Sequence, residues 1–474
     1  MSHDCESSMS SVSDGSVGLV SSSERSLTKS LSPRHLSMIA LGGAIGAGLL
    51  VASSTAITVA GPAVILSYVF AGVILTLVMR MLGELSSASP QTGSFSAYAH
   101  RFIGAWAGFT VGWLYWWFWA VTVAIEATAA ATIISGWFPA FEQWAVAGVL
   151  VLALTLLNLV SVRVYGESEF WFSSVKVFAL GLLIVLGVLA LVGVIPHSSA
   201  GLFQLVDHGG FFPHGVGAVF SALLAVIFSM FGAEIVTIAA GESTHPRESV
   251  VKAVRAVLLR ILIFYIGAIA VTLCVVPWTS IVSGVSPFVT VFESFGVPYA
   301  AVVMNIVVLT ALISCLNASL YSSSRMLFAM ASRGDAPRFL GGVSSVGSPW
   351  VAVIFSSCVG VASVLLNYFM PDAVFSFLVN TTGATGIFVW LFIAVSHLRS
   401  RRILLAEGVD VTTRADVLKM WAFPYLNWAL IVVLVALLLF MGVSVEHRYE
   451  VLISTGVAVV VVFFGWLRSV RVTR

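Results

Sequence analysis

Charged residues are scarce in this sequence. Only 9% of its 474 residues are Asp, Glu, Lys or Arg, whereas an ordinary soluble domain carries about a quarter. Hydrophobic residues make up 59% of the chain, and the mean hydropathy is +1.04. This composition excludes an ordinary soluble domain and indicates a membrane protein.

Other absences narrow the class further. The four cysteines are Cys5 near the start and Cys274, Cys315 and Cys358 inside apolar runs, so no disulfide is expected. The motifs G-x-x-x-x-G-K-[ST] and H-E-x-x-H do not occur, which argues against nucleotide hydrolysis and metal-dependent catalysis. We therefore do not expect an enzyme, a cofactor, a metal site or nucleic acid as a partner.

The sequence does contain apolar runs of about 20 residues, each long enough to cross the hydrocarbon core of a bilayer as a helix. Short alternating strands, which an outer-membrane barrel needs, are absent. The expected fold class is an all-α polytopic membrane protein with about 12 transmembrane helices. We place the spans at 36–57, 62–83, 103–131, 142–162, 172–195, 215–240, 255–277, 300–330, 350–369, 372–396, 422–443 and 449–467.

The positions of Lys and Arg indicate the topology. Those in the connections and tails fall in both tails and in the even-numbered connections, with Arg448 as the exception, and such an excess is typical of cytoplasmic loops. We therefore expect a multi-pass protein of the cytoplasmic membrane with both termini in the cytoplasm. The stretch 1–33 is Ser-rich and has no apolar core, which predicts a disordered cytoplasmic tail. The stretch 468–474 is expected to form the C-terminal tail.

Clusters of glycine and polar residues are expected to interrupt two of the spans. "GGAIGAG" (42–48) lies in the first span, and "FSMFGAE" (228–234) lies five spans later. An odd-numbered unit is inverted when it is repeated, and interrupted helices at matching positions indicate a transporter's binding site. We expect five-helix repeats at 34–195 and 215–397, followed by two peripheral helices at 422–467. For "GGAIGAG" alone, a small-residue packing face is the alternative.

A helix that stops inside the membrane leaves N–H and C=O groups without partners, and a substrate can supply those partners. Amides at the start of a half-helix suit a carboxylate, and freed carbonyls suit an ammonium group. An amino acid zwitterion offers both groups. The two interruptions therefore predict an amino acid site near mid-membrane.

Three ionisable residues are expected inside the membrane, where each charge costs roughly 2.5–3.5 kcal/mol on insertion scales. Glu126 is either a proton relay or substrate contact, or a protonated carboxyl group bonded to a neighbouring helix. Lys176 either snorkels to the headgroups or replaces a coupling sodium ion and carries the proton. Glu234 lies within the second interruption, where we expect it to tie loose backbone amides together; a substrate contact or a part in proton coupling is the alternative.

Several other side chains are candidates for the walls of the site. One pair shares a helix face with Glu126 at the spacing i, i+4 and i+7, two phenylalanines belong to the second interruption, and one serine lies in the eighth span. These candidates are Trp119, Val123, Phe228, Phe231 and Ser319. Packing, or hydrogen bonding between helices, is the alternative for each of them.

Many motifs occur in register from about Arg34 to the twelfth span. Among them are "RHLSMIALGGAIGAGLL", "AGPAVILSY", "MRMLGELSSASPQTGSFSAYA", "GWLYWWFW", "YGESEFWFSSVKV", "GAEIVTIAAGES", "SRMLFAMASRGDAP" and "FLVNTTGAT". In these motifs the sequence resembles the bacterial amino acid permeases of the amino acid-polyamine-organocation superfamily. The resemblance implies a leucine-transporter-like 5+5 inverted repeat with discontinuous helices 1 and 6. It also implies proton-coupled uptake across the cytoplasmic membrane.

The same resemblance implies roles for individual residues. The substrate carboxylate would be held by backbone groups at Ala44, Ile45, Gly46, Ala47 and Gly48, and the ammonium group by the backbone around Phe228, Ser229, Phe231 and Gly232. Lys176 matches the lysine that stands where sodium binds in sodium-driven relatives. Glu126 matches an acid that is common in this branch.

Within the family, "GWLYWWFW", "SCLNASLYSSSRML" and "LVNTTGATG" resemble γ-aminobutyrate (GABA) permeases most. Two departures flank the site: the second leucine of "GAGLLVASS" and Gly241 in "AGES". We expect a symporter that imports a zwitterionic amino acid, with GABA first and with aromatic, proline or other neutral amino acids as alternatives. The proton gradient is the expected energy source. A channel is the rival of another class, but four-fold pore motifs and rings of charge are absent.

Overall fold

The computed structural model describes Met38 and residues 45–89, 91, 94–160, 162–195, 200–239, 246–345, 347–369, 371–414, 417–445 and 447–472. The expected N-terminal tail, Ala44 and the last two residues of the chain lie outside these ranges. Within them, the regular secondary structure is helical and contains no strand. This confirms the all-α fold class.

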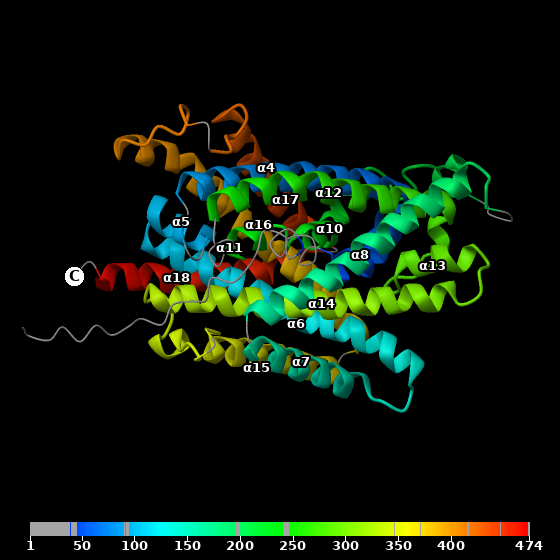
Figure 1. The fold of residues 1–474 in the computed structure, drawn as a ribbon. Helices are drawn as coiled ribbons and strands as arrows, with labels where there is room; N and C mark the ends of the chain where they lie inside the picture. Colours follow the sequence, from blue (N-terminus) through cyan, green and yellow to red (C-terminus); the bar gives the residue numbers. More distant parts are fainter. Residues whose placement is uncertain are drawn as a thin grey trace, which may run out of the picture.

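The helices follow the order expected for two five-span units (Figure 1). The first unit contains α2 (Ala47–Leu50), α3 (Ala52–Ala60), α4 (Val64–Ala88), α5 (Ser94–Phe102), α6 (Ala105–Trp137), α7 (Gln143–Val160) and α8 (Val162–Leu191). The second contains α9 (Gly217–Ser221), α10 (Leu223–Met230), α11 (Ile235–Ala239), α12 (Pro246–Val275), α13 (Pro287–Ser294), α14 (Ala300–Ser332), α15 (Trp350–Phe369) and α16 (Pro371–Ala406). They are followed by α17 (Tyr425–Val443) and α18 (Arg448–Val472).

The lengths of the apolar helices account for the expected crossings. Within the described ranges, 9 helical runs are long and apolar enough to span a membrane. The first of them, Ala52–Ala88, has 37 residues and as one helix would measure about 55 Å, far more than a single crossing needs. It contains both α3 and α4, which meet at a 3₁₀ turn beginning at Gly61, whose φ is 60°. Because this run counts as two crossings, the 9 runs supply ten of the 12 expected crossings. Two shorter apolar helices, Leu262–Val275 and Trp350–Ala362, supply the other two.

Corresponding helices of the two units pack against one another. α6 lies along α14, α4 along α12 and α7 along α15, and the members of each pair are five spans apart in the chain (Figure 1). This pairing is consistent with two inverted copies of one five-helix unit. α18 packs against α6 and α16, so this added helix also touches the core of the repeats.

Several helices extend beyond the expected spans: α12 begins at Pro246 and not at 255, and α16 ends at Ala406 and not at 396. Two further differences concern α8 and α18. α8 begins at Val162, whereas the fifth span was expected to begin at 172. The polar stretch "YGESE" ended the apolar run in the sequence, but Tyr165 and Glu169 are buried in the fold, where helical residues can face protein instead of lipid. α18 continues to Val472, into the stretch expected to be the C-terminal tail.

The described residues of both segments, 45–48 and 228–234, include breaks in the helical backbone. α10 ends at Met230, and Gly232 has a φ of 115°, which glycine adopts at little steric cost. The chain becomes helical again at Ile235. In the first span, Gly46 is extended, with φ of −137° and ψ of −153°, and α2 begins directly after it at Ala47.

A buried carboxylate connects three segments near one end of the bundle. Glu84, close to the end of α4, accepts hydrogen bonds from Arg401 of α16 at 2.7 and 2.8 Å. It also accepts one from the backbone N–H of Met420, which precedes α17. The Nε2 atom of His397 lies 3.2 Å from the same carboxylate. Glu84 is only 2% exposed, and an unpaired charge at such a position is strongly destabilising.

We expect Arg401→Ala to destabilise the protein, because it leaves Glu84 buried without its bidentate partner. Removing one member of a buried pair costs about 3–5 kcal/mol, and less is expected here because the Arg401 side chain is 18% exposed. The melting temperature in detergent should fall clearly below that of the wild type. Arg402→Ala, at an exposed position one residue further on, should leave it unchanged. Equal melting temperatures for the two variants would contradict this role of Arg401.

Candidate functional site

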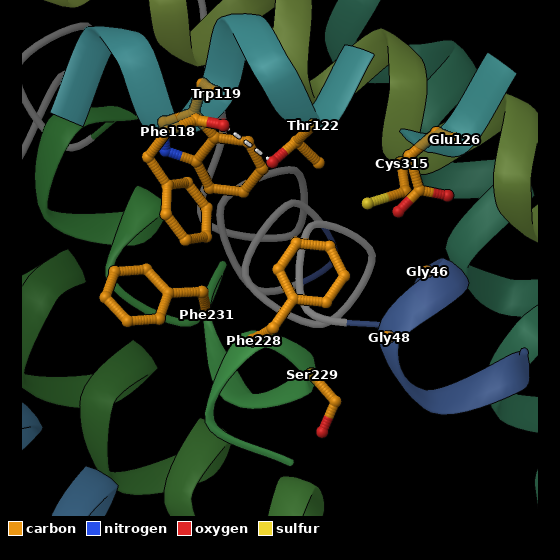
Figure 2. A pocket seen from close by; sticks show the side chains of 10 residues that line it. All are labelled: Gly46, Gly48, Phe118, Trp119, Thr122, Glu126, Phe228, Ser229, Phe231 and Cys315. Atoms are coloured by element: carbon orange, nitrogen blue, oxygen red, sulfur yellow. Dashed lines mark hydrogen bonds between the residues drawn. The ribbon is translucent and has the colours of Figure 1, made fainter. Parts of the chain in front are cut away.

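A small cavity lies between α2, α6, α10 and α14, beside both backbone breaks (Figure 2). It is lined by Gly46, Gly48, Phe118, Trp119, Thr122, Glu126, Phe228, Ser229, Phe231 and Cys315. The cavity volume is about 10 Å³, which is room for about one water molecule. In this conformation the surrounding side chains therefore fill most of the site.

The carboxylate of Glu126 accepts a hydrogen bond from the backbone at the first break. Its two oxygens lie 2.9 and 3.0 Å from the Ala47 amide nitrogen, and the residue is 1% exposed. Ala47 is the first residue of α2, so its N–H has no acceptor within the helix. A side chain from α6 thus supplies the acceptor that the interrupted backbone lacks.

Glycine is required where the first span approaches its neighbours. A Cβ atom at Gly46 would lie 2.4 Å from Cys315 Sγ and 2.5 Å from Glu126 Oε1, and both distances are too short for non-bonded atoms. A Cβ atom at Gly48 would lie 2.5 Å from the Cα atom of Ser229. These two glycines therefore allow α2 to contact α6, α14 and α10 at once, which brings the two breaks together.

Polar side chains also form hydrogen bonds with the backbone at the second break. Glu234 Oε2 accepts a hydrogen bond from the Gly232 amide at 3.1 Å, and Tyr115 OH lies 3.5 Å from Oε1. The hydroxyl group of Tyr265, on α12, donates to the Ser229 carbonyl at 2.9 Å. A carbonyl oxygen has two lone pairs, and this bond uses one of them.

Aromatic rings form one wall of the cavity. Phe118 packs against Phe231 with 4.4 Å between ring centroids, and Phe231 stacks on Trp390 of α16 at 4.6 Å with an interplanar angle of 8°. Trp119 and Phe228 lie 5.2 and 6.1 Å from Phe118. Rings at these distances attract one another, so they place a firm apolar surface beside the polar breaks.

The fold brings most of the expected site residues to this cavity. Those that line it are Gly46, Gly48, Trp119, Glu126, Phe228, Ser229 and Phe231. Ala47 contributes its amide, whereas Ile45 and Gly232 are buried in the breaks without lining the cavity. Ala44 lies outside the described residues.

Two expected residues face other neighbours. A Cβ atom at Gly360 of α15 would lie 2.6 Å from Val123, so Val123 packs against α15. Ser319 Oγ donates to the carbonyl of Cys315 at 2.7 Å, one turn away on its own helix. Neither Val123 nor Ser319 lines the cavity.

Three lining residues were missed by sequence reasoning: Phe118, Thr122 and Cys315. Thr122 takes the place expected for Val123, because 119, 122 and 126 also share one face of a helix, at i, i+3 and i+7. Phe118 belongs to the aromatic run "WLYWWFW", which covers every side of its helix. Cys315 reaches the cavity only because α14 packs along α6.

Lys176 is close to the cavity but does not line it. Its side chain is fully buried, so it does not snorkel to the headgroups, and its Nζ atom is 3.9 Å from Glu169 Oε1. It also interacts electrostatically with Glu126. Sequence reasoning missed Glu169 because the expected fifth span began after it. The spacing of seven residues to Lys176, two helical turns, is the signal that would have found it.

Two interrupted helices meet at a buried cavity that combines backbone amides, backbone carbonyls, an aromatic wall and ionisable side chains. Such a site in a bundle of two five-helix units is typical of secondary transporters. These features define a helical membrane transporter with a leucine-transporter-like fold.

Comparison with known proteins identifies the family. Residues 35–470 match the model of the amino acid permease family. The chain is 46% identical to the probable GABA permease of Pseudomonas aeruginosa, over 95% of this chain and 94% of that protein. It is 40% identical to an aromatic amino acid transport protein of Corynebacterium glutamicum, over 93% of this chain and 96% of that protein. The chain therefore belongs to the amino acid permease family, which confirms the resemblance seen in its motifs.

A solved structure shares the fold. The crystal structure of a mutant manganese transporter from Eremococcus coleocola aligns with 95% of this chain and 99% of its own, with a TM-score of 0.57 and 14% sequence identity. At this identity the likeness concerns the fold alone. Together with the apolar helices, the family places the protein within a membrane and gives it an amino acid as substrate.

We expect Gly46→Ala to abolish amino acid uptake, because the added methyl group would displace the Glu126 carboxylate from the Ala47 amide. Uptake of a labelled amino acid by cells with equal amounts of each variant in the membrane measures the effect. The matched control is Gly136→Ala on α6, where an added Cβ atom meets nothing within 4 Å. Normal uptake by Gly46→Ala would leave this glycine with no role in transport.

Proposed function

We propose that this protein is a proton-coupled symporter that imports a zwitterionic amino acid, with GABA as the first candidate. The substrate is suggested by the 46% identity to the probable GABA permease. The observation that carries the mechanism is the contact of the Glu126 carboxylate with the Ala47 amide. We place the protein in the cytoplasmic membrane with both termini in the cytoplasm, in line with its basic loops.

Glu126 and the substrate carboxylate compete for the same amide. The Ala47 N–H is bonded to Glu126, and we assign the substrate carboxylate to the same backbone donor. Two carboxylates at one amide repel each other strongly in a site shielded from water. Glu126 must therefore become protonated when substrate binds. Uptake of this proton makes the binding of substrate and the binding of the proton depend on each other.

The ammonium group of the substrate is assigned to the second break. The Ser229 carbonyl has a lone pair beyond the one bonded to Tyr265, and Ser229 lies directly beside Gly48 of the first break. The two charged ends of an amino acid thus have partners in one cavity. Phe228 and Phe231 offer apolar surface for the methylene chain that separates the charges of GABA.

Lys176 is proposed to take the place of the sodium ion in sodium-driven relatives. It is fully buried and interacts electrostatically with Glu126, so a proton gained or lost there changes the charge beside the cavity. A change of charge in a low-dielectric site can bias the equilibrium between outward- and inward-facing states. The proton gradient is then the energy source, and no cofactor is required.

An aromatic amino acid is the second candidate substrate. Its ring would pack against the wall formed by Phe118, Phe228 and Phe231. The 40% identity to an aromatic amino acid transport protein supports this alternative. The cavity of about 10 Å³ must widen for either substrate, and it must widen more for an aromatic ring.

In proteoliposomes with an imposed proton gradient, labelled GABA is expected to accumulate above its external concentration. Accumulation should collapse when a protonophore is added. Unlabelled GABA should compete with the label, and phenylalanine and proline at the same concentration should not. Competition by phenylalanine without competition by GABA would establish the aromatic alternative. Flux that only runs downhill would contradict a symporter and indicate a channel.

Glu126→Gln is expected to abolish concentrative uptake, because glutamine keeps an acceptor for the Ala47 amide but cannot take up a proton. Labelled substrate should only equilibrate across the membrane, and its binding should no longer depend on pH. Both are measured in proteoliposomes with and without a proton gradient. Glu142→Gln, at an exposed position beyond the end of α6, is the matched control. Wild-type accumulation by Glu126→Gln would remove this carboxyl group from proton coupling.

A further inference from the structure

Glu169 is a buried carboxyl group that the mechanism above does not use. It lies on α8 seven residues before Lys176, so both side chains occupy the same face of the helix, two turns apart. The residue is 0% exposed. An acid inside a membrane helix is costly, and its retention there points to a function.

The two oxygens of this carboxyl group have different surroundings. Oε1 accepts hydrogen bonds from Ser173 at 3.1 Å and from Ser314 of α14 at 2.7 Å, and Lys176 Nζ lies 3.9 Å from it. Oε2 is buried and has no hydrogen-bond partner among the residues that the structure describes. One oxygen is therefore held in place, while the other remains open to a proton.

Lys176 has two acids as electrostatic partners. It interacts electrostatically with Glu126 at the cavity and with Glu169 on its own helix. The thiol of Cys315, on α14, is a fourth ionisable group, and it interacts electrostatically with Glu126, Lys176 and Glu169. A flexible lysine between two carboxyl groups can exchange a proton with each of them in turn.

Beyond Glu169, aromatic and basic side chains continue toward one end of the bundle. α8 and α14 lie side by side (Figure 1). Along them, Tyr165 stacks on Tyr321 with 4.1 Å between ring centroids, and the Arg325 guanidinium lies 4.1 Å from the Tyr321 ring. In the orientation proposed above, this end of both helices is the cytoplasmic one. Glu169 thus lies between Lys176 and the cytoplasmic side.

We propose that Glu169 receives the proton that Lys176 releases in the inward-facing state and passes it to the cytoplasm. In this step an N–H bond of the Lys176 ammonium breaks and an O–H bond forms at Glu169 Oε2, which leaves an amine and a carboxylic acid. The proton then moves from Glu169 to cytoplasmic water, and the carboxylate is restored. This step rests on the proposed proton coupling, because it describes how the coupled proton is released into the cytoplasm.

Burial favours the transfer. An ammonium and a carboxylate both carry a desolvation cost in a site without water, whereas the amine and the acid are neutral. The two serine hydroxyl groups at Oε1 support the charged form, and the open Oε2 accepts the proton in the neutral form. Lys176 Nζ lies 3.9 Å from the neighbouring oxygen, Oε1, and the transfer requires it to reach hydrogen-bond distance of Oε2, which its flexible side chain allows.

Glu169→Gln in proteoliposomes separates proton release from substrate movement. Glutamine keeps an oxygen that accepts from Ser173 and Ser314 but cannot take up a proton. Exchange of labelled for unlabelled GABA needs no proton release and should stay near the wild-type rate. Net proton-driven uptake should fall at least about tenfold, the effect expected for loss of a positioned proton acceptor. Glu169→Asp keeps a carboxyl group and should recover part of the net uptake.

The matched control is Glu167→Gln, a half-buried glutamate on the same helix, which should behave as the wild type in both assays. Net uptake by Glu169→Gln at the wild-type rate would overturn the proposal. Equal loss of exchange and net uptake in a protein of wild-type stability would also overturn it, because that result indicates a structural role alone. If Glu169→Gln does not fold, Ser314→Ala replaces it, and net uptake must again fall more than exchange.

The wild type tests the proposed function separately. A wild-type protein that does not accumulate GABA under a proton gradient would refute the coupling itself. A wild type that does accumulate GABA, together with a Glu169→Gln variant that accumulates it equally well, would refute only the role of Glu169.

Discussion

Every N–H and C=O group that an interrupted helix frees inside a membrane needs a partner, because the hydrocarbon core contains no water to supply one. In this protein, side chains from other parts of the bundle and from the second break supply these partners. The contacts are those of Glu126 with the Ala47 amide, Glu234 with the Gly232 amide and Tyr265 with the Ser229 carbonyl. They stabilise the breaks, and the breaks in turn provide the backbone groups that a zwitterion can use.

These contacts within the protein have a consequence for binding. A substrate does not meet vacant donors; it has to replace contacts that already exist, starting with Glu126 at the Ala47 amide. A hydrogen bond to a charged group has a net value of about 1.5–3 kcal/mol, and replacing one carboxylate by another at the same amide gains much less than that. Modest net gains suit a transporter, which must release its substrate on the far side of the membrane. The small cavity follows from the same arrangement, because the side chains that satisfy the backbone also fill the space.

Sequence reasoning located both breaks because glycine and polar residues are unusual in an apolar run, and this is visible one span at a time. It placed Trp119 and Glu126 at the site because seven residues make two helical turns. It chose Val123 for the same face and missed Thr122, which lines the cavity. That choice depends on tertiary packing, since Gly360 of α15 leaves room for the Val123 side chain.

Other parts of the site depend on contacts between distant segments, which no single span reveals. Cys315 reaches the cavity through the packing of α14 along α6, a consequence of the repeat and not of any local motif. Glu169 was missed for a different reason. Its polar neighbours lowered the apparent hydropathy, although the helix continues through them and buries the acid. Hydropathy identifies helical segments that face lipid, and it underestimates the length of helices whose polar side chains face the protein interior.

The first break and the proposed proton route form one electrostatic unit. A single lysine can neutralise only one of two buried acids at a time, so the charge left uncompensated depends on which acid is protonated. In the proposed mechanism, Glu126 is neutral and Lys176 pairs with Glu169 when substrate holds the Ala47 amide. When substrate leaves, the Glu126 carboxylate returns to the amide and competes for the same lysine. In this mechanism the amide that binds the substrate also determines which acid pairs with Lys176. The interruption of the helix exposes that amide, and it therefore couples the binding of substrate to the binding of the proton.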